Sequence, residues 1–585
     1  MNITGSRRNI FVLLLVFIAA CAKISQPTGG ARDKLPPVVI RSTPSNGATG
    51  FKGKKIELSF NEYVVLDNIN EKLLVSPPLL KRPRTSIRGK SIIIEYDEEL
   101  KDNTTYAFYF LDAIRDLNES NILDNYKFVF STGRVIDSLS VTGTVLTIPD
   151  LEVPAKTSVL LYSNLQDSAV VKTFPDYISR VDPTGSFRFD NIRNGQYRLY
   201  ALTDDDNSKN YNRVEEPFAF LDTLITVTTE GNYITPDTTV KTGRNTGGGY
   251  KLFLFKAALK SRYLTNSSRQ SKYKLTYSLS LPPDSLDFTF SIPEVADDKY
   301  LIEKSMRGDT MTVWLTDSSL YSLPLISTVI KYPFTDSLGN DIYRHDTVAM
   351  RFLAPRIRGT KSVPKLSISN NIPGGVIKPG RKVVFTAETP LREPDITRTG
   401  LYEMIEKDRH KIPYSLQKDS LNSGKLALNA ALVEGGQYLF IADSAAFGNI
   451  YNEVNDSLAV RFSVGKADSY SSISINVINC RTNCIIQLLS NSEKLIAEQV
   501  PGPSGNVEFK LLDRGTYRVR AIFDTNGDGR WTTGDFFTGR QPEPVSYLPK
   551  ELVLQEGWQV KETWDLSVTN VKDPKLRQKA NTTTR

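Results

Sequence analysis

A twelve-residue stretch that begins at Asp524 has the residue types and spacing of a calcium-binding loop. Ca²⁺ takes six to eight hard oxygen ligands, and such loops supply them from positions 1, 3, 5, 7, 9 and 12, with glycine at position 6. Gly529 occupies position 6. The six ligand positions fall on Asp524, Asn526, Asp528, Arg530 (through its backbone carbonyl), Thr532 and Asp535. The spacing predicts a structural Ca²⁺ site, and the alternative is an Asn/Asp/Gly-rich connection that forms its own turn hydrogen bonds.

A weaker version of this loop lies 320 residues earlier in the chain. Its candidate oxygens belong to Asp204, Asp206, Ser208, Asn210 and Glu215. Lys209 stands where such loops have glycine, so we expect this copy to bind an ion less well. The segments that flank the Asp524 loop read as strands rather than helices, which excludes an EF-hand domain. An ion in either loop would be structural, because no nucleophile or general base is indicated nearby.

The two loops belong to an internal repeat whose register holds without a gap. The matching pairs are Gly185 and Gly505, Phe189 and Phe509, Gly195 and Gly515, Tyr197 and Tyr517, Ala201 and Ala521, and Asp204 and Asp524. A repeat of this kind predicts two copies of one domain. Its G-x-F-x-F…G-x-Y-x-L pattern resembles the prealbumin-like or carboxypeptidase-regulatory-like β-sandwich. The resemblance implies two strands joined by a turn in each copy.

Alternating apolar and polar positions mark the strands that precede the first repeat. Ile56, Leu58 and Phe60 alternate with polar residues, and turn residues recur every 8–12 positions, which predicts an antiparallel sandwich. The segments Thr43–Gly47 (Thr-Pro-Ser-Asn-Gly) and Phe128–Gly133 (Phe-Val-Phe-Ser-Thr-Gly) resemble the bacterial Ig-like domain of S-layer type. That domain opens many surface lipoproteins of Bacteroidota.

The whole chain predicts an all-β fold, a tandem array of about five Ig-like and prealbumin-like antiparallel β-sandwiches. We expect an elongated rod. The predicted divisions are a signal peptide at 1–20, a tether at 21–36, an Ig-like domain at 37–134, a prealbumin-like domain at 135–230, a linker at 231–249, Ig-like domains at 250–356 and 357–465, a second prealbumin-like domain at 466–568 and a basic tail at 569–585.

The N-terminus predicts a secreted and lipid-anchored protein. Arg7 and Arg8 precede a short apolar run that ends in Ile18-Ala19-Ala20-Cys21, a pattern typical of a secretory signal. The last four residues resemble the lipobox of bacterial lipoproteins. This resemblance implies that Cys21 is acylated, becomes the mature N-terminus and anchors the chain in membrane lipid. We expect an outer-membrane lipoprotein exposed at the cell surface, with palmitate on Cys21.

Two further cysteines, Cys480 and Cys484, flank a predicted tight turn. A disulfide is sterically plausible there and a secreted chain permits it, whereas the alternative is two reduced thiols. Zinc is not expected, because neither a histidine nor a second cysteine pair accompanies them.

The chain has only two histidines, His345 and His410, and neither lies in a catalytic motif. We therefore predict a non-enzymatic scaffold or interaction protein. The resemblance to Bacteroidota lipoproteins implies an accessory subunit of an outer-membrane β-barrel machine for barrel assembly or protein export. The alternative is a surface adhesin or glycan-binding lipoprotein that uses exposed aromatics such as Trp531 and Trp558. The net charge of +8 derives largely from the signal and the basic tail, so no nucleic-acid partner is expected.

Overall fold

The computed structural model describes residues 33–229, 231–235, 249–284, 286–336, 339–353, 365–480 and 483–567. Cys21, the signal peptide, most of the predicted tether and the basic tail lie outside these residues. The prediction of an all-β fold is confirmed: antiparallel strands dominate, and the α-helices among the described residues are single turns. No helix in this part of the chain has the length and apolar character needed to cross a membrane.

The first sandwich packs a four-stranded sheet, β1-β2-β6-β5, over a three-stranded sheet, β10-β7-β4. The pleat sends alternate side chains inward, so Ile56, Leu58 and Phe60 join Phe108 and Phe130 in a core of aliphatic and aromatic side chains. Its elements are β1 (Val39–Thr43), β2 (Lys55–Phe60), β3 (Val64–Leu66), α2 (Ile69–Lys72), β4 (Leu74–Ser76), β5 (Arg84–Arg88), β6 (Ser91–Glu95), β7 (Thr105–Tyr109), β8 (Ile114–Asp116), β9 (Ile122–Leu123) and β10 (Lys127–Ser131).

The second and fifth sandwiches have the same topology, as the repeat predicts. In each, a three-stranded sheet (β14-β11-β19 or β39-β36-β43) faces a larger one (β13-β12-β15 or β38-β37-β40, with further strands paired to β15 or β40). The second comprises β11 (Leu139–Thr147), β12 (Ser158–Tyr162), α3 (Ala169–Lys172), β13 (Tyr177–Arg180), β14 (Ser186–Ile192), β15 (Gly195–Leu202), β16 (Phe218–Phe220), β17 (Leu224–Thr228), β18 (Gly231–Thr235) and β19 (Tyr250–Leu254). The fifth comprises β36 (Ser471–Ile478), β37 (Asn483–Ser490), β38 (Leu495–Gln499), β39 (Asn506–Leu512), β40 (Gly515–Asp524), η5 (Phe536–Thr538), β41 (Val545–Tyr547), β42 (Leu552–Leu554) and β43 (Gln559–Asp565).

The equivalence of the two copies extends to single hydrogen bonds. The Tyr197 hydroxyl donates to the Arg193 carbonyl at 2.8 Å, and the Tyr517 hydroxyl donates to the Asp513 carbonyl at 2.7 Å. Gly185 and Gly505 both adopt positive φ angles, of 84° and 72°, where a side chain would be strained. The glycine and tyrosine signature therefore reflects turn geometry that both copies share.

The third and fourth sandwiches join the two repeats. The third contains β20 (Leu264–Arg269), β21 (Lys274–Leu279), β22 (Thr289–Ser291), η1 (Asp297–Lys299), β23 (Tyr300–Lys304), β24 (Thr310–Leu315), α4 (Ser318–Tyr321), β25 (Leu325–Thr335) and β26 (Asp341–Arg351). The fourth contains β27 (Ser369–Asn370), η2 (Pro373–Gly375), β28 (Val376–Ile377), β29 (Val383–Thr386), η3 (Ile396–Arg398), β30 (Thr399–Ile405), β31 (Asp408–Lys411), β32 (Tyr414–Lys418), β33 (Lys425–Ala430), β34 (Gln437–Ala442), β35 (Leu458–Val464) and η4 (Ala467–Ser469). Each has its own apolar core.

Two predicted boundaries need correction. β19, at Tyr250–Leu254, was assigned to the third domain, but it pairs in parallel with β11 of the second sandwich. The predicted linker at 231–249 also begins with a strand, since β18 pairs with β17. The fifth sandwich closes its smaller sheet in the same way, with β43 parallel to β36. The final strand of each repeat returns across the whole sandwich, and short-range sequence patterns do not reveal such a pairing.

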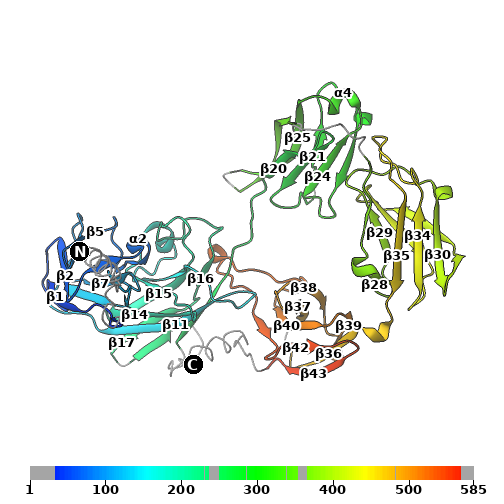
Figure 1. Cartoon of the computed structure of the whole chain (residues 1–585). Coiled ribbons are helices and arrows are strands. Elements are labelled where there is room, and N and C mark those ends of the chain that lie inside the picture. The colour runs from blue at the N-terminus through cyan, green and yellow to red at the C-terminus, as the bar shows by residue number, and fades with distance from the viewer. Residues whose placement is uncertain are drawn as a thin grey trace, which may run out of the picture.

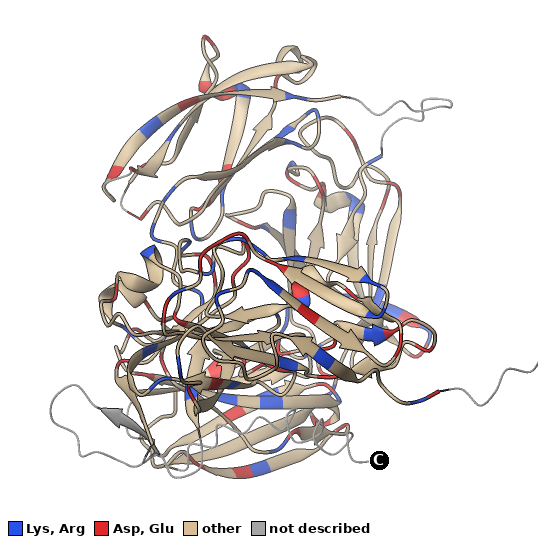
Figure 2. Cartoon of the chain, turned by 90° about the vertical axis from the view of Figure 1, so that its left-hand side faces the viewer, with Lys and Arg blue, Asp and Glu red and all other residues tan. Residues whose placement is uncertain are grey.

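The predicted rod is also wrong. Figure 1 shows the third and fourth sandwiches arching away from the second and returning to a fifth that lies beside the second. One apolar cluster contains residues of both the second and the fifth sandwich. The chain therefore closes on itself, with its two repeats in contact. In the view of Figure 2, Lys and Arg are interspersed with Asp and Glu over the strands.

Candidate metal-binding loops and the junction between the repeats

The Asp524 loop begins at the last residue of β40 and turns on hydrogen bonds to the Asp524 carboxylate. Its Oδ1 accepts from the Gly527 and Asp528 amides at 2.6 and 3.2 Å, and its Oδ2 accepts from the Gly529 amide at 3.0 Å. Gly527 and Gly529 have φ angles of 75° and 72°, which glycine adopts without strain. Both oxygens of the predicted first ligand are thus bonded within the loop.

The next predicted ligands of this loop also bond to one another. Asp528 Oδ1 accepts from the Arg530 amide at 2.8 Å, and Asp528 Oδ2 accepts from the Thr532 hydroxyl at 3.0 Å. The Asn526 side-chain amide donates to Thr532 Oγ1 at 2.8 Å. The Arg530 amide, followed by the Thr532 hydroxyl, lowers the pKa of Asp528. These contacts are the turn-forming arrangement that the sequence left open as the alternative to an ion.

Glu543, rather than Asp535, closes the Asp524 loop. Glu543 is 4% exposed, and its Oε1 accepts from the Thr525 amide at 2.7 Å while its Oε2 accepts from the Thr532 amide at 2.9 Å. Asp535 instead forms an ion pair of 2.5 Å with Lys260. Asp535, the predicted twelfth-position ligand, is engaged by this ion pair, and the loop runs on past it to the segment before β41.

The Asp204 loop begins as the Asp524 loop does, with a carboxylate that accepts amides of the following residues, but its later residues form different contacts. Asp204 Oδ1 accepts from the Ser208 amide at 3.0 Å, and Asp204 Oδ2 accepts from the Lys209 amide at 2.9 Å. Asp206 accepts from the Ser208 amide at 2.9 Å and from the Asn212 side-chain amide at 3.0 Å. Asn210 offers its carbonyl to the Ser208 hydroxyl at 2.9 Å.

Glu216, not Glu215, is the acidic residue that joins this loop. Glu215 is exposed, whereas Glu216 is 1% exposed and accepts from the Asp205 amide at 3.0 Å. One carboxylate oxygen each from Asp204, Asp206 and Glu216 lies within 4.8 Å of the other two. Glu216 precedes β16 by two residues, as Glu543 precedes β41, so the sheet pairing places the two glutamates equivalently. The sequence spacing places the predicted ligand on its exposed neighbour, Glu215.

The surroundings raise the pKa of two carboxyl groups in this loop and lower the pKa of the third. Burial raises the pKa of Asp204, and the neighbouring Asp206 raises it further. Burial also raises the pKa of Glu216. Hydrogen bonds from Asn212 and Ser208 lower the pKa of the exposed Asp206 to about 2. A charged Asp206 thus lies beside two carboxyl groups whose ionisation is disfavoured.

The junction between the repeats joins the outer faces of two equivalent sheets. The second sandwich contributes residues of β12, β15 and β16, and the fifth contributes residues of β37, β40 and β41. Its principal side chains are Leu160, Tyr162, Tyr200, Leu202, Phe218, Phe220, Phe255, Ile485, Leu489, Ile522, Val545 and Tyr547. Burial of an apolar face of this kind is favourable at roughly 25 cal/mol per Å².

Phe536 inserts from the Asp524 loop into the aromatic side of this junction. Its ring centroid lies 5.1 Å from that of Phe218, 5.4 Å from Phe220 and 5.8 Å from Tyr200, with steeply inclined planes in each pair. Such edge-to-face pairs add about 0.5–1.5 kcal/mol each beyond area burial. The loop predicted to hold an ion therefore carries a docking residue.

Polar contacts fix the rim of the junction. Gln541 Nε2 donates to the Phe220 carbonyl at 3.0 Å and to Asp222 Oδ1 at 2.7 Å. The Arg520 guanidinium, 8% exposed, donates to Asp150 Oδ1 at 2.7 Å. These directional contacts define one orientation of the fifth sandwich against the second.

A sequence signal for the junction exists at Val159–Tyr162 and Cys484–Leu489. Both segments are nearly continuous apolar runs rather than alternating ones, and such runs are typical of strands buried on both faces. The structure buries all these residues. One face of each run lies in its own sandwich core and the other lies in the junction.

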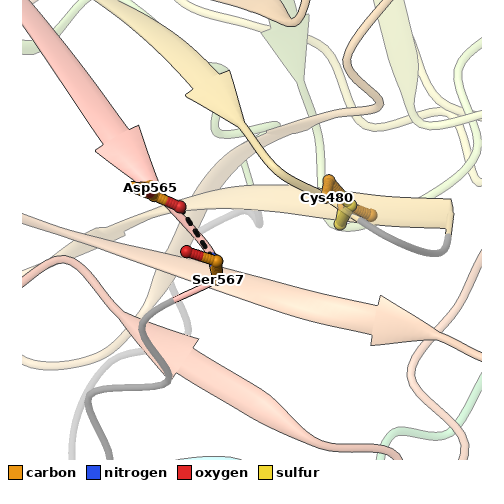
Figure 3. The surroundings of a disulfide bond; sticks show 4 residues. Cys480, Asp565 and Ser567 are labelled. Atoms are coloured by element: carbon orange, nitrogen blue, oxygen red, sulfur yellow. Dashed lines mark hydrogen bonds between the residues drawn. A yellow bond between two sulfur atoms is a disulfide. The ribbon is translucent and has the colours of Figure 1, made fainter.

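Cys480, just after β36, and Cys484, in β37, form a disulfide in the fifth sandwich (Figure 3). Their Cα atoms are 6.6 Å apart, within the range that the bond spans. Asn479, next to Cys480, donates to Asp565 Oδ1 at 3.0 Å, and the Ser567 amide donates to the same oxygen at 2.9 Å. The disulfide therefore lies at one end of the β36–β43 pair.

The N-terminal sandwich is similar to a known domain family. Residues 33–132 match the bacterial Ig-like domain. The match covers the first sandwich and agrees with the resemblance seen in its sequence. No curated protein matches the chain.

Several solved structures align with the chain at low similarity. The major pilin subunit of Bacillus cereus is 10% identical over 73% of this chain and 99% of its own, with a TM-score of 0.13. Domains 1–6 of the surface layer protein SbsC are 10% identical over 89% of this chain and 67% of their own, with a TM-score of 0.13. Native alpha-2-macroglobulin from Escherichia coli, spanning domains MG0-NIE-MG1, is 13% identical over 51% of this chain and 98% of its own, with a TM-score of 0.18. Scores this low support no conclusion about the arrangement or role of this chain.

Proposed function

We propose that the chain is a non-enzymatic, lipid-anchored scaffold at the bacterial outer membrane, where it serves as an accessory subunit of a β-barrel machine for barrel assembly or protein export. The observation that carries the proposal is the contact between the two repeats, which closes the second to fifth sandwiches into one frame. A frame with fixed internal contacts holds a partner in one geometry at a smaller entropy cost than a flexible string of domains.

The placement of reactive groups agrees with a binding role. Both histidines of the chain, His345 on β26 and His410 on β31, have exposed side chains. The buried carboxylates Asp524 and Glu543 accept backbone N–H groups of their own loop. Trp531, a candidate for glycan stacking, packs against the junction and donates its ring N–H to the Glu543 carbonyl at 3.1 Å. These groups stabilise turns and interfaces.

The anchor is tested by replacing Cys21 with serine in the full-length chain. We expect the wild-type protein in the outer-membrane fraction and the Cys21→Ser variant in the soluble fraction, because serine provides no thiol for acylation. A Cys480→Ser, Cys484→Ser double variant is the matched control, since it removes the two disulfide-bonded cysteines and leaves the anchor. Equal membrane retention of wild type and Cys21→Ser would contradict lipid anchoring.

The partner is tested by purifying the tagged wild-type chain in mild detergent from its own outer membrane and identifying what accompanies it by mass spectrometry. We expect one β-barrel protein at about one copy per chain. Recovery of the chain alone from well-solubilised membranes would overturn the scaffold proposal and favour a glycan-binding adhesin.

A further inference from the structure

The Asp204 loop contains a buried carboxylate oxygen that has no hydrogen-bond partner in the described part of the chain. Glu216 is 1% exposed, its Oε1 accepts from the Asp205 amide, and its Oε2 is buried without a donor. A buried polar atom left unpaired costs about 1–3 kcal/mol, and more when it is charged. Because native structures rarely leave such an atom unsatisfied, Glu216 Oε2 calls for a partner that the described residues do not provide.

The carboxylates of Asp204 and Asp206 meet Glu216 at this point. One oxygen of each of the three side chains lies within 4.8 Å of the others. Three carboxylates so close repel one another when ionised, which raises the cost of the arrangement. A cation placed among them would remove the repulsion, and coordination through Glu216 Oε2 would also satisfy the unpaired oxygen.

The loop carries two basic residues, Lys209 and the exposed Arg213, and the Lys209 ammonium points to the first sandwich. This ammonium donates to the Leu79 carbonyl of the first sandwich at 2.9 Å. The Lys209 backbone has a φ of 60°, close to the 72° of Gly529 at the equivalent position of the second copy. Lysine therefore adopts the turn that favours glycine, and its charge does not occupy the space among the three carboxylates.

We propose that Asp204, Asp206 and Glu216 bind a hard divalent cation, Ca²⁺, and that the Asp524 loop does not. Three carboxylates provide the oxygen-only donor set that Ca²⁺ prefers, and backbone carbonyls or water complete its coordination. The equivalent Glu543 has donors on both oxygens, from Thr525 and Thr532. The inference is independent of the proposed scaffold function.

An ion here would stabilise a loop that touches three sandwiches. Lys209 contacts Leu79 of the first sandwich. Tyr211 stacks on Phe218 of the second at 4.2 Å between ring centroids and faces Phe536 of the fifth at 6.1 Å. Because Ca²⁺ would bind only the ordered loop, it would stabilise these contacts through ligand linkage.

Calcium titration of the full-length chain in detergent, after removal of metal with EDTA and dialysis, tests the proposal. The weakest Ca²⁺ modules have Kd values near 10⁻³ M, so isothermal titration should extend to about 10 mM. We expect one Ca²⁺ per wild-type chain and at least about a tenfold rise in Kd for Glu216→Gln. Glu215→Gln is the matched control, because it removes the adjacent, exposed carboxylate, and it should bind as wild type does.

Two further variants keep the test decisive. Asp206→Asn changes an exposed ligand and should also weaken binding about tenfold, including in the event that Glu216→Gln does not fold. Asp528→Asn in the second loop should leave both stoichiometry and Kd unchanged. No Ca²⁺ binding by the wild-type chain, or wild-type binding by folded Glu216→Gln or Asp206→Asn, would overturn the proposal.

Discussion

The Asp204 and Asp524 loops occupy equivalent places in two copies of one domain, yet they satisfy their carboxylates differently. The span from Asp524 to Glu543 is seven residues longer than the span from Asp204 to Glu216. The longer loop provides Thr532, whose amide donates to Glu543 Oε2 at 2.9 Å. The shorter loop provides no such donor, and Glu216 Oε2 has no partner among the residues that the structure describes.

The longer loop also carries the residues that dock on the other copy. Phe536 enters the aromatic cluster around Phe218, and the Thr533 hydroxyl donates to the Lys256 carbonyl at 2.6 Å. One insertion therefore has two structural consequences. It closes the carboxylate loop with backbone donors, and it supplies a contact between the repeats. The difference shows that agreement with a metal-loop spacing does not identify the copy that lacks internal donors.

The largest effect is expected from Phe536→Ala. Loss of this half-buried ring should destabilise the junction by about 3 kcal/mol, near the lower end of the range for a core phenylalanine. The fifth sandwich should then separate from the second in a fraction of molecules, which small-angle X-ray scattering would detect as a larger radius of gyration. Phe537→Ala is the matched control: its ring is 62% exposed, so we expect under about 1 kcal/mol. Equal effects of the two variants would show that the Phe536 contact does not hold the junction.

A smaller effect is expected from Glu543→Gln, which sharpens the comparison of the two loops. The new amide group would place N–H donors against the Thr525 or Thr532 amide, at a cost of about 1–3 kcal/mol. Hydrogen exchange of these two amides should accelerate equally with and without Ca²⁺. Glu216→Gln should behave differently, because its Oε1 still accepts from Asp205 and its Oε2 has no bond to lose. That variant should lose only the protection that Ca²⁺ gives to the wild-type loop, and a Ca²⁺-dependent effect of Glu543→Gln would contradict the contrast.

Local sequence signals predicted much of the fold and the starts of both loops. Alternation at Ile56, Leu58 and Phe60 identified a half-buried strand, because side-chain direction in a strand depends only on position. Gly185 and Gly505 identified the repeat, since their turns need positive φ. Asp524 is the last residue of β40 and Asp204 lies two residues after β15, and each accepts amides from the next few residues.

The closing residues of the loops could not be predicted in this way. Whether Glu215 or Glu216 faces Asp204 depends on how β16 pairs with β15, and successive residues of an extended chain point in opposite directions. Phe536 finds its partners more than 300 positions away, so no local pattern encodes the contact. The rod was expected because each sandwich was treated as complete. The apolar runs of β12 and β37 have a second face to bury, and that face brings the repeats together.

The smallest effect is expected from Asp535→Asn, which tests whether the predicted metal ligand instead serves the junction. Burial opposes ionisation of Asp535, but the ion pair with Lys260 prevails and lowers its pKa. A lowered folded-state pKa stabilises the structure above the unfolded pKa, and this contribution is lost as pH falls through the folded pKa. The Lys260 side chain is 65% exposed, so the pair should contribute at most about 1 kcal/mol at pH 7. Asparagine can still accept from the Phe537 amide as Asp535 does, which leaves the cap of η5 in place.

The difference in urea midpoint between wild type and variant should therefore shrink as pH is lowered from 7 toward about 3. A difference that stayed constant over this range would assign the effect to packing rather than to charge.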